Sequence, residues 1–539
     1  MELEKFSIPA TNRFASLYLH QEKPVTDYFH YDLSQSSLYE QRVKDLEMRD
    51  FQRRKLAKCI EDYMNPFPSS EKVNDSLRKL KTNGVVVIGG QQAGLLTGPL
   101  YSIHKIISII VLAKQQEQAL NVPVIPVFWI AGEDHDYQEI NHVFAFDEGK
   151  SFKLSYPESN LEKQMVSSLE FDKDKMSNWI RSVFEHFGET FYTNDLLKFI
   201  EVAIESTTSI VDLFSYIVME LFKDEGLLII DSANPSLREI EAPFFRQLLE
   251  KHSAITGKLL LQQTQIQDDG FQPMIEASKQ SMNLFVQHKG ERLLLEMTPN
   301  GGVGKNTQIN WSMDQLRLLL EESPHMFSNN VVTRPLMQEW LFPTLAFIAG
   351  PGEIAYWGEL KKSFEEMDLK MPPIVPRQNI TFVEREIQQL LRELDKEADL
   401  VIRDGLKKDK AAFIGSIKDE ELQTYLDQTK QFLAQQYENI TLRAETIEKG
   451  LIPLVEKNLA IHLNQLHFLE NKIEKSILFR EKVVLDKYDR ITAALLPEDA
   501  PQERVWNVFY FLNKYGESFV TDLLDLPYTW DGTHNLIHV

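Results

Sequence analysis

The chain has 539 residues, 43% of them hydrophobic, and a formal net charge of −22. This length predicts about two to four domains, and the apolar fraction excludes a disordered chain. The acidic balance excludes a nucleic-acid backbone as the main partner, because that contact needs a basic face. A local basic pocket for a small anion stays possible.

Cys59 is the single cysteine, so no intramolecular disulfide can form, which is typical of a reducing cytoplasm. The first residues lack a basic segment followed by an apolar one, so we expect no signal peptide. The longest apolar runs, 106–113 and 122–131, fall short of the roughly 20 residues of a membrane span. A cytoplasmic protein without a membrane partner is therefore predicted.

The N-terminal region, residues 1–82, is predicted to be helical. A charged helix is expected over 35–64, ending before the breaker cluster Asn65-Pro66-Phe67-Pro68. A second helix is expected over about 70–81.

Residues 83–114 predict a buried strand, a glycine-rich loop and a helix. The β-branched run 85–88 is typical of a strand buried on both faces. Pro99 suits the first turn of the following helix, and a helix N-terminus attracts anions. The polar residues around this junction are Gln91, Gln92, Thr97, His104 and Lys105. The stretch matches neither GxGxxG nor GxxxxGK[ST], so a plain packed β–loop–α unit remains an alternative to a ligand site.

The same pattern recurs at 122–130, 227–230 and 345–348, each an apolar run followed by a polar or glycine-rich loop. Four such units predict an α/β core over residues 1–380, a doubly wound Rossmann-like parallel sheet with inserted connecting subdomains at about 140–220 and 236–340. The second insert contains strand-like runs at 283–287 and 292–296. Residues 300–305 resemble a P-loop only superficially, and a mobile turn or lid is the preferred interpretation.

Polar clusters follow these strands, where open α/β sheets bind ligands. Glu133, Asp134, His135 and Asp136 could provide acid–base catalysis, since carboxylates beside a histidine raise its pKa. A solvated acidic turn is the alternative. A metal site is not predicted, because no second His or Cys lies at zinc spacing.

Other side chains near predicted strand ends are candidate ligand contacts. Asn234 follows the third strand, and Glu353 follows a Gly-Pro-Gly turn, where it could also simply favour the helix dipole. Tyr356 and Trp357 are either site or core residues. Arg334 and Arg377 are candidate anion contacts.

A nucleotide clamp is a further hypothesis. Arg490 and Trp506 could hold a base between a cation and a stacking face, with Asn379 and Tyr510 as additional candidates.

The character of the sequence changes at Thr381. Thr381 and Glu384 form a predicted capping box that starts a helix, and residues 381–487 are predicted to form a helical hairpin or coiled coil. Its apolar seam has spacings of three and four: Ile452, Val455, Leu459, His462, Leu466, Leu469 and Ile473. The hairpin could pack within the chain or form a homodimer. The aromatic tail, residues 488–539, is expected to pack back on the core.

Four long motifs resemble one family end to end: residues 89–105, 128–140, 333–360 and 375–381. The sequence is similar to the cysteine-adding ligases of bacillithiol biosynthesis in Bacillus-like bacteria. That resemblance implies an enzyme that joins the carboxyl group of cysteine to the amino group of glucosaminyl-malate, in the last step of the pathway. It also implies a core like the nucleotide-binding fold of class I aminoacyl-tRNA synthetases. Residues 97–104 stand where those enzymes carry HxGH, but neither HxGH nor a KMSKS-like loop is present.

The resemblance implies roles for the candidate residues. Activation of the carboxylate would need a cosubstrate such as ATP or another adenine nucleotide, with Mg²⁺. His135, supported by Asp134 or Asp136, would be the base, with Glu133 and His104 as further catalytic candidates. Lys105 and the glycine loop would hold phosphate or malate carboxylates, Arg334 or Arg377 a second carboxylate, and Glu353 an amino group. The remaining substrate-binding candidates are Gln91, Gln92, Thr97, Gly98, Tyr101, Asn234, Tyr356 and Trp357.

Two other functions stay open from the sequence. One is a nucleotidyltransferase of the same fold that adenylates another small acid. The other is a non-enzymatic coiled-coil scaffold whose α/β core senses a small anion.

Overall fold

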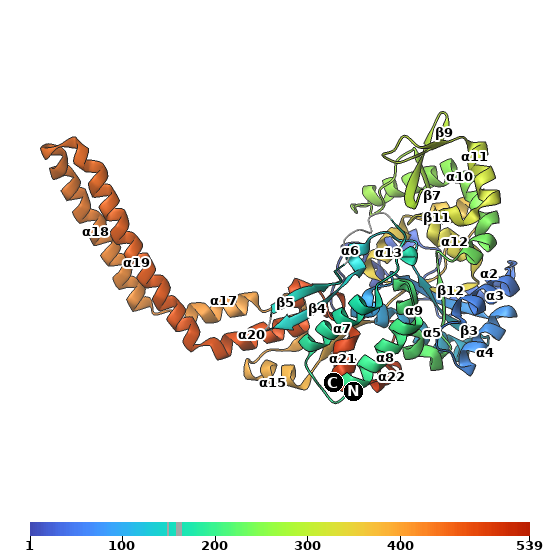
Figure 1. The fold of residues 1–539 in the computed structure, drawn as a ribbon, viewed down its shortest axis with the longest axis horizontal. Helices are drawn as coiled ribbons and strands as arrows, with labels where there is room; N and C mark the ends of the chain where they lie inside the picture. Colours follow the sequence, from blue (N-terminus) through green and yellow to red (C-terminus); the bar gives the residue numbers. More distant parts are fainter. Residues whose placement is uncertain (148–149, 158–163) are drawn as a thin grey trace. The chain divides into compact units, whose positions relative to one another are not determined.

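A computed structural model describes residues 1–147, 150–157 and 164–539. The chain divides into two compact units. The first comprises residues 1–146, 151–383 and 500–539, and the second comprises 147–150 and 384–499. Many of the elements of both are labelled in Figure 1.

The first unit is built around a five-stranded parallel sheet in the order β13-β12-β2-β3-β6. The strands are β2 (Val85–Gln91), β3 (Val124–Ile130), β6 (Leu228–Asp231), β12 (Thr344–Ala349) and β13 (Ile374–Pro376). Strand β2, the first of these five in the chain, lies in the middle, and the sheet extends from it in both directions. The doubly wound prediction is therefore confirmed, and β13 is a strand that the sequence analysis did not predict.

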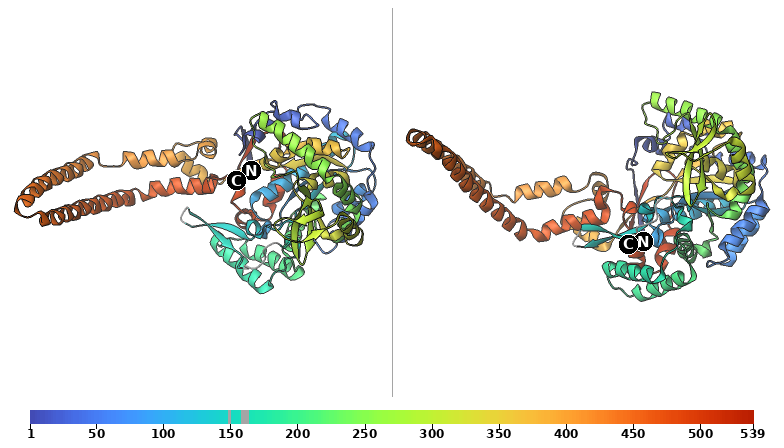
Figure 2. Two further views of the ribbon diagram at one scale, coloured as in Figure 1. Left: turned by 90° about the horizontal axis from the view of Figure 1, so that it is seen from above. Right: turned by 45° about the horizontal axis from the view of Figure 1, so that its top comes forward.

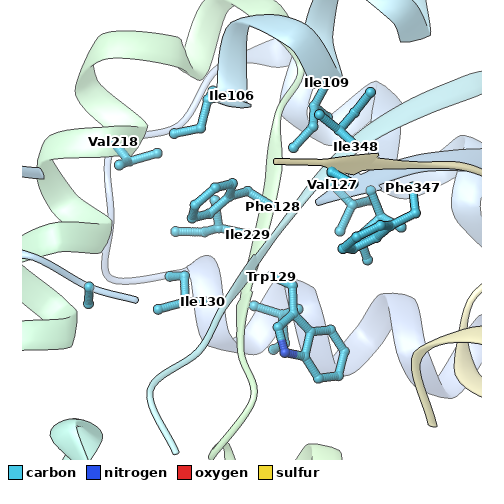
Figure 3. Close-up of a cluster of buried hydrophobic side chains, with 14 of the residues drawn as sticks. Ile106, Ile109, Val127, Phe128, Trp129, Ile130, Val218, Ile229, Phe347 and Ile348 are labelled. Atoms are coloured by element: carbon cyan, nitrogen blue, oxygen red, sulfur yellow. The ribbon is translucent and has the colours of Figure 1, made fainter. Parts of the chain in front are cut away.

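Helix α5 (Leu100–Leu120) contacts β2, β3 and β12, and most of its length is buried. Figure 3 shows apolar side chains from α5, β3, β6, β12 and helix α9 (Ile210–Phe222) gathered in one cluster. Phe128 of β3 stacks on Phe214 of α9 with ring centroids 5.9 Å apart. Apolar burial of this kind stabilises the sheet that carries the strand-end loops.

The N-terminal helices differ from the prediction at one point. The predicted helix over 35–64 is two helices, α2 (Leu38–Glu47) and α3 (Arg53–Met64). Phe51 lies between them, under the guanidinium groups of Arg49 and Arg53 at 4.8 and 5.5 Å. The predicted second helix is α4 (Glu71–Lys81).

The first insert contains the hairpin β4 (His142–Asp147) and β5 (Lys150–Ser155), followed by α7 (Lys173–Phe187), α8 (Thr193–Ser206) and α9.

The second insert begins with the long helix α10 (Pro235–Asp268) and continues into an antiparallel sheet in the order β10-β9-β8-β7-β11. Strands β7 (Ser281–His288) and β8 (Glu291–Thr298) confirm the two predicted runs. The proposed lid at 300–305 is instead largely strand β9 (Gly301–Gly304), paired with β8 and with β10 (Asn310–Trp311). The other elements here are β11 (Phe327–Asn329), α11 (Met313–Glu322) and α12 (Thr333–Leu341).

Thr381 does not start a helix. It lies in β14 (Asn379–Val383), which pairs in parallel with β15 (His534–His538), and β15 also pairs with β1 (Glu2–Phe6). Helix α15 (Arg385–Glu393) begins after Glu384 instead. Pairing with a strand about 150 residues away overrides the local capping signal. Helices α21 (Val508–Tyr515) and α22 (Ser518–Leu524) precede β15 in the first unit.

The second unit is helical. Its elements are α15, α16 (Ala398–Asp404), α17 (Lys407–Ser416), α18 (Glu420–Ile447), α19 (Ile452–Arg480) and α20 (Lys482–Leu495). Helices α18 and α19 lie side by side as the predicted hairpin (Figure 2).

The hairpin seam differs from the prediction at two points. Leu463 and Glu470 are half-buried, whereas His462 and Leu469 are exposed. The seam still passes through Ile452, Leu466 and Ile473, so the difference is local and the spacings remain three and four residues. Glu470 enters the seam as the partner of Lys430 of α18, at 2.8 Å.

Candidate functional site

A cleft opens at the carboxyl ends of β2 and β12, the two neighbouring strands from which the sheet winds in opposite directions. Ligands of open α/β sheets bind at such a topological switch point. The cavity measures about 340 Å³. Eight of the predicted site residues line this switch-point cleft: Gln91, Gln92, Tyr101, Lys105, Arg334, Glu353, Tyr356 and Arg377.

Lys105 lies at the base of the switch-point cleft on α5. Its ammonium donates hydrogen bonds to the Gly90 carbonyl (2.7 Å), to Gln91 Oε1 (3.2 Å) and to Glu353 Oε2 (2.5 Å). Burial lowers the pKa of Lys105, and Glu353 opposes that shift. Gly90 must be glycine here, because a Cβ would lie 2.7 Å from the Trp129 carbonyl.

Arg334 reaches the switch-point cleft from the first turn of α12. Its Nη2 donates to the Tyr356 hydroxyl at 2.7 Å, and its Nη1 donates to Gln338 Oε1 at 3.3 Å. Two neutral partners therefore orient this guanidinium and leave its charge available to an anion.

Arg377 follows β13 and is 6% exposed. Its Nη1 and Nη2 each donate to one oxygen of Glu503, both at 2.6 Å. Glu503 also lies 3.2 Å from Nδ1 of His104. His104, a predicted catalytic residue, is fully buried and does not line the cleft; it contacts the carboxylate that holds Arg377.

The helix N-terminus that faces the switch-point cleft is not the predicted one. The Leu100 N–H, at the start of α5, donates to the Trp506 carbonyl at 2.9 Å. Thr97 and Gly98 are buried beside it and do not line the cleft. The segment that ends at Asn507 therefore covers the loop that we expected to bind an anion.

Helix α13 (Pro351–Gly358) begins in the switch-point cleft instead. The Gly350 N–H donates to Glu353 Oε2 at 2.7 Å. No atom lies within 4 Å of the position a Cβ of Gly352 would occupy, so a ligand can approach this backbone closely.

The acidic loop after β3 lies largely outside the switch-point cleft. Glu133 is buried in ion pairs: Arg238 joins it to Glu241. Asp134 accepts a hydrogen bond from Gln92 Nε2 at 2.7 Å. His135 is 43% exposed, and Asp136 is exposed; neither lines the cleft. The predicted base therefore has no geometric support, because His135 does not line the cavity.

Two further predicted contacts have structural roles. Asn234 caps α10, accepting from the Leu237 N–H at 3.1 Å. Trp357 is 0% exposed and stacks between Phe347 and Phe364, so it belongs to the core.

The predicted nucleotide clamp is not assembled within one unit. In the first unit, Trp506 is stacked on Phe146 (4.0 Å between ring centroids) and contacts Tyr510 in a tilted arrangement (4.2 Å). Arg490 lies in the second unit and pairs with Glu386. Asn379 lies in β14, where its carbonyl accepts from Asn535 Nδ2 at 3.2 Å. No base-stacking face formed by these residues lines the switch-point cleft.

The switch-point cleft also contains residues that sequence reasoning missed. Trp129 and Glu139 line it from the segment around the acidic loop, and Arg504 lines it from the C-terminal region. Within the described part of the chain, the buried indole N–H of Trp129 has no hydrogen-bond partner. Trp129 lies in the motif 128–140 and could have been identified from it. The sequence around Arg504 and Glu503 gives no such signal, because the partners of these two residues are more than 100 residues away.

Three arginines and one lysine line the switch-point cleft against two carboxylates, Glu139 and Glu353. The cavity is thus locally cationic in an acidic chain. Among the described residues, no group of three or more His, Cys, Asp or Glu side chains could hold a metal ion. Within the same residues, every helix is too short or too polar to traverse a lipid bilayer.

Comparisons with known proteins give one consistent result. Residues 1–378 match the family domain described as "Bacillithiol biosynthesis BshC, N-terminal Rossmann-like domain", and residues 380–539 match "Bacillithiol biosynthesis BshC, C-terminal coiled-coil domain". Proteins named "Putative cysteine ligase BshC" are 43% identical in Bacillus licheniformis, 41% in Bacillus velezensis and 40% in a Geobacillus strain. Each alignment covers 100% of this chain and 100% of the relative.

Proposed function

Because the chain belongs to the BshC family of bacillithiol biosynthesis, we propose that it is a cysteine ligase that forms an amide between the carboxyl group of cysteine and the amino group of glucosaminyl-malate. The reaction would complete bacillithiol. The observation that carries the proposal is the cationic switch-point cleft, which suits a substrate with two malate carboxylates.

Different residues of the switch-point cleft would bind the carboxylates and the amino group of the substrate. Arg334 and Arg377 are held by partners that leave guanidinium N–H groups free, so they would bind carboxylates of the sugar substrate. Arg504 is exposed at the cleft and would serve the same chemistry. Glu353, at the start of α13, would accept a hydrogen bond from the amino group that attacks.

A carboxylate does not condense with an amine in water without activation, and ATP would supply that activation when bound. The cationic side chains and the first turn of α13 fit phosphate groups. Mg²⁺ would then be held chiefly by the phosphates, as is common for this ion.

The proposal includes a homodimer formed through the coiled-coil helices, and a cytoplasmic location. Large apolar side chains are exposed on both α18 and α19, which supports a partner helix pair. The single cysteine supports a reducing compartment.

The test uses the purified full-length protein with cysteine, glucosaminyl-malate, ATP and Mg²⁺, followed by mass spectrometry. We expect the thiol-containing amide, together with AMP or ADP, which identifies the mode of activation. Arg334→Gln should abolish turnover, whereas Arg246→Gln, at an exposed ion pair of α10, should not. Folded protein that binds the sugar substrate and forms no amide would contradict the ligase. AMP formation with an acid other than cysteine would favour a nucleotidyltransferase.

A further inference from the structure

We propose that Glu503 is a positioning residue: it holds the Arg377 guanidinium in the orientation in which Arg377 binds an anionic group of the substrate. The inference deepens the proposed function and rests on it only for the identity of that substrate. If the inference is right, the C-terminal segment that carries Glu503 helps to form the switch-point cleft.

The first argument is the geometry of the pair. Both terminal nitrogens of Arg377 donate to Glu503, one to each carboxylate oxygen, at 2.6 Å. A bidentate pair fixes the plane of the guanidinium as well as its position. An arginine has five N–H donors, so donors remain on Arg377 for a ligand in the cavity that it lines.

The second argument is how Glu503 is itself held. His104 Nδ1 lies 3.2 Å from Glu503 Oε2, and because a carboxylate only accepts, this nitrogen carries the hydrogen. Burial lowers the pKa of His104, although Glu503 opposes the shift, so the imidazole is neutral. Burial alone would raise the pKa of Glu503. The contacts with Arg377 and His104 outweigh burial and lower the pKa, so the carboxylate stays ionised.

The third argument is the segment that carries Glu503. Next to it, the side-chain amide of Gln502 bonds both the N–H (2.8 Å) and the carbonyl (2.9 Å) of Phe382 in β14. Asn507 Nδ2 donates to the carbonyls of Leu96 (2.9 Å) and Gly98 (2.7 Å). Glu503 is therefore fixed from both sides, as a positioning group must be.

A positioning role and a simple charge-balancing role for Glu503 predict opposite effects when its charge is removed. If Glu503 only balanced the charge of Arg377, removing its charge would make the cleft more cationic and would strengthen anion binding. If Glu503 positions Arg377, the same change lets the guanidinium rotate and weakens anion binding. Glu503→Gln distinguishes these outcomes by the direction of the effect.

The experiment measures binding of L-malate to the full-length protein by calorimetry, and KM and kcat for the sugar substrate. We expect Glu503→Gln to weaken L-malate binding and to raise KM at least tenfold, with a smaller effect on kcat. Glu503→Asp keeps the charge but shortens the reach, and it should also weaken binding. In an Arg377→Gln background, Glu503→Gln should add no further loss. Glu517→Gln, at an exposed position in the same region, is the matched control.

Three results would overturn the proposal: unchanged or tighter L-malate binding by folded Glu503→Gln, full additivity of the two substitutions, or wild-type protein that does not bind L-malate. If Glu503→Gln fails to fold, the Glu503→Asp result decides alone. Wild-type protein that binds L-malate but makes no amide would count against the proposed function and would leave the positioning role supported by binding.

Discussion

Glu353 lines the switch-point cleft, whereas His135 lies outside it and is partly exposed. This difference makes opposite predictions for two substitutions. Glu353→Gln should lower kcat/KM by about 100-fold or more, because it removes a carboxylate that would contact the reacting amine and the partner of Lys105. His135→Ala should change kcat/KM by less than about threefold. Steady-state ligation assays measure both, with thermal unfolding to verify folding.

Loss of turnover in a folded His135→Ala protein would restore His135 as the base and would require the acidic loop to rearrange. Near-normal turnover of Glu353→Gln would remove Glu353 from the chemistry.

His534 predicts a pH dependence of stability. Its pKa is lowered to about 4, chiefly by burial; Glu503 opposes this shift, and His104 and Arg377 contribute to it. In the unfolded chain the pKa is about 6.5, so between these values the unfolded state binds more protons. Stability is therefore complete above pH 6.5 and is lost as the pH falls toward 4. The loss from this one group between pH 7 and pH 5 is about 2 kcal/mol.

His534→Gln should reduce the difference in unfolding free energy between pH 7 and pH 5 by that amount, as measured with urea. His467→Gln, at an exposed position on α19, should leave the difference unchanged. An identical pH dependence in His534→Gln and the wild type would contradict the depressed pKa.

At the scale of elements, Asn507 fastens the glycine loop. Its amide donates to two buried carbonyls, and the loop includes Leu96 and Thr97 at φ angles of 49° and 69°, which L-residues seldom adopt. Asn507→Ala leaves both carbonyls without this donor and should destabilise the protein by about 2 kcal/mol. Urea unfolding measures the effect, with exposed Asn300→Ala as control. Equal stability of the two variants would show that the loop holds its conformation without Asn507.

The elements that sequence predicted are those whose signal is local. Strands β2, β3, β6 and β12 are apolar runs, and helices α5, α18 and α19 have clear periodicity. Strands β13, β14 and β15 were missed because they are short and form only with distant partners; Asn379 pairs with His534, for example.

The candidate site follows the same rule. Residues of the switch-point cleft within contiguous motifs, such as Lys105 and Glu353, were found from the sequence. The function of the α5 N-terminus was mispredicted, because the group that occupies it, the Trp506 carbonyl, lies about 400 residues away. Glu503 was missed for the same reason: its importance comes from Arg377 and not from its neighbours in sequence.

At the scale of the whole molecule, charge is unevenly distributed. The chain carries a formal charge of −22, yet basic side chains outnumber acidic ones in the switch-point cleft. Bulk charge therefore predicts solubility and weak affinity for polyanions, while the local field of the cleft decides which small anion binds.

The helices of the second unit carry large apolar side chains that are exposed among the described residues. Leu442, Leu469 and Phe479 are among those on α18 and α19. A regular set is formed by Tyr425, Phe432, Ile440 and Ile447 on α18 and by Leu454, Ile461 and Phe468 on α19. They recur at intervals of seven or eight residues, so each helix presents an apolar stripe of the kind that a second pair of helices covers in a coiled-coil assembly.

A homodimer through these stripes predicts a molecular mass near 125 kDa in solution, twice the 62.5 kDa of the chain. Phe432→Glu combined with Phe468→Glu should give a folded monomer, because both residues are exposed within the chain and a charge buried between copies is costly. Gln431→Glu combined with Ala460→Glu adds the same charge at exposed positions that lie on neither the apolar stripe nor the seam of their helices, and this protein should remain dimeric. Light scattering after size-exclusion chromatography measures all three proteins. If the Phe432→Glu/Phe468→Glu protein is dimeric, the dimer contact lies on another surface. A monomeric wild type would contradict the dimer itself.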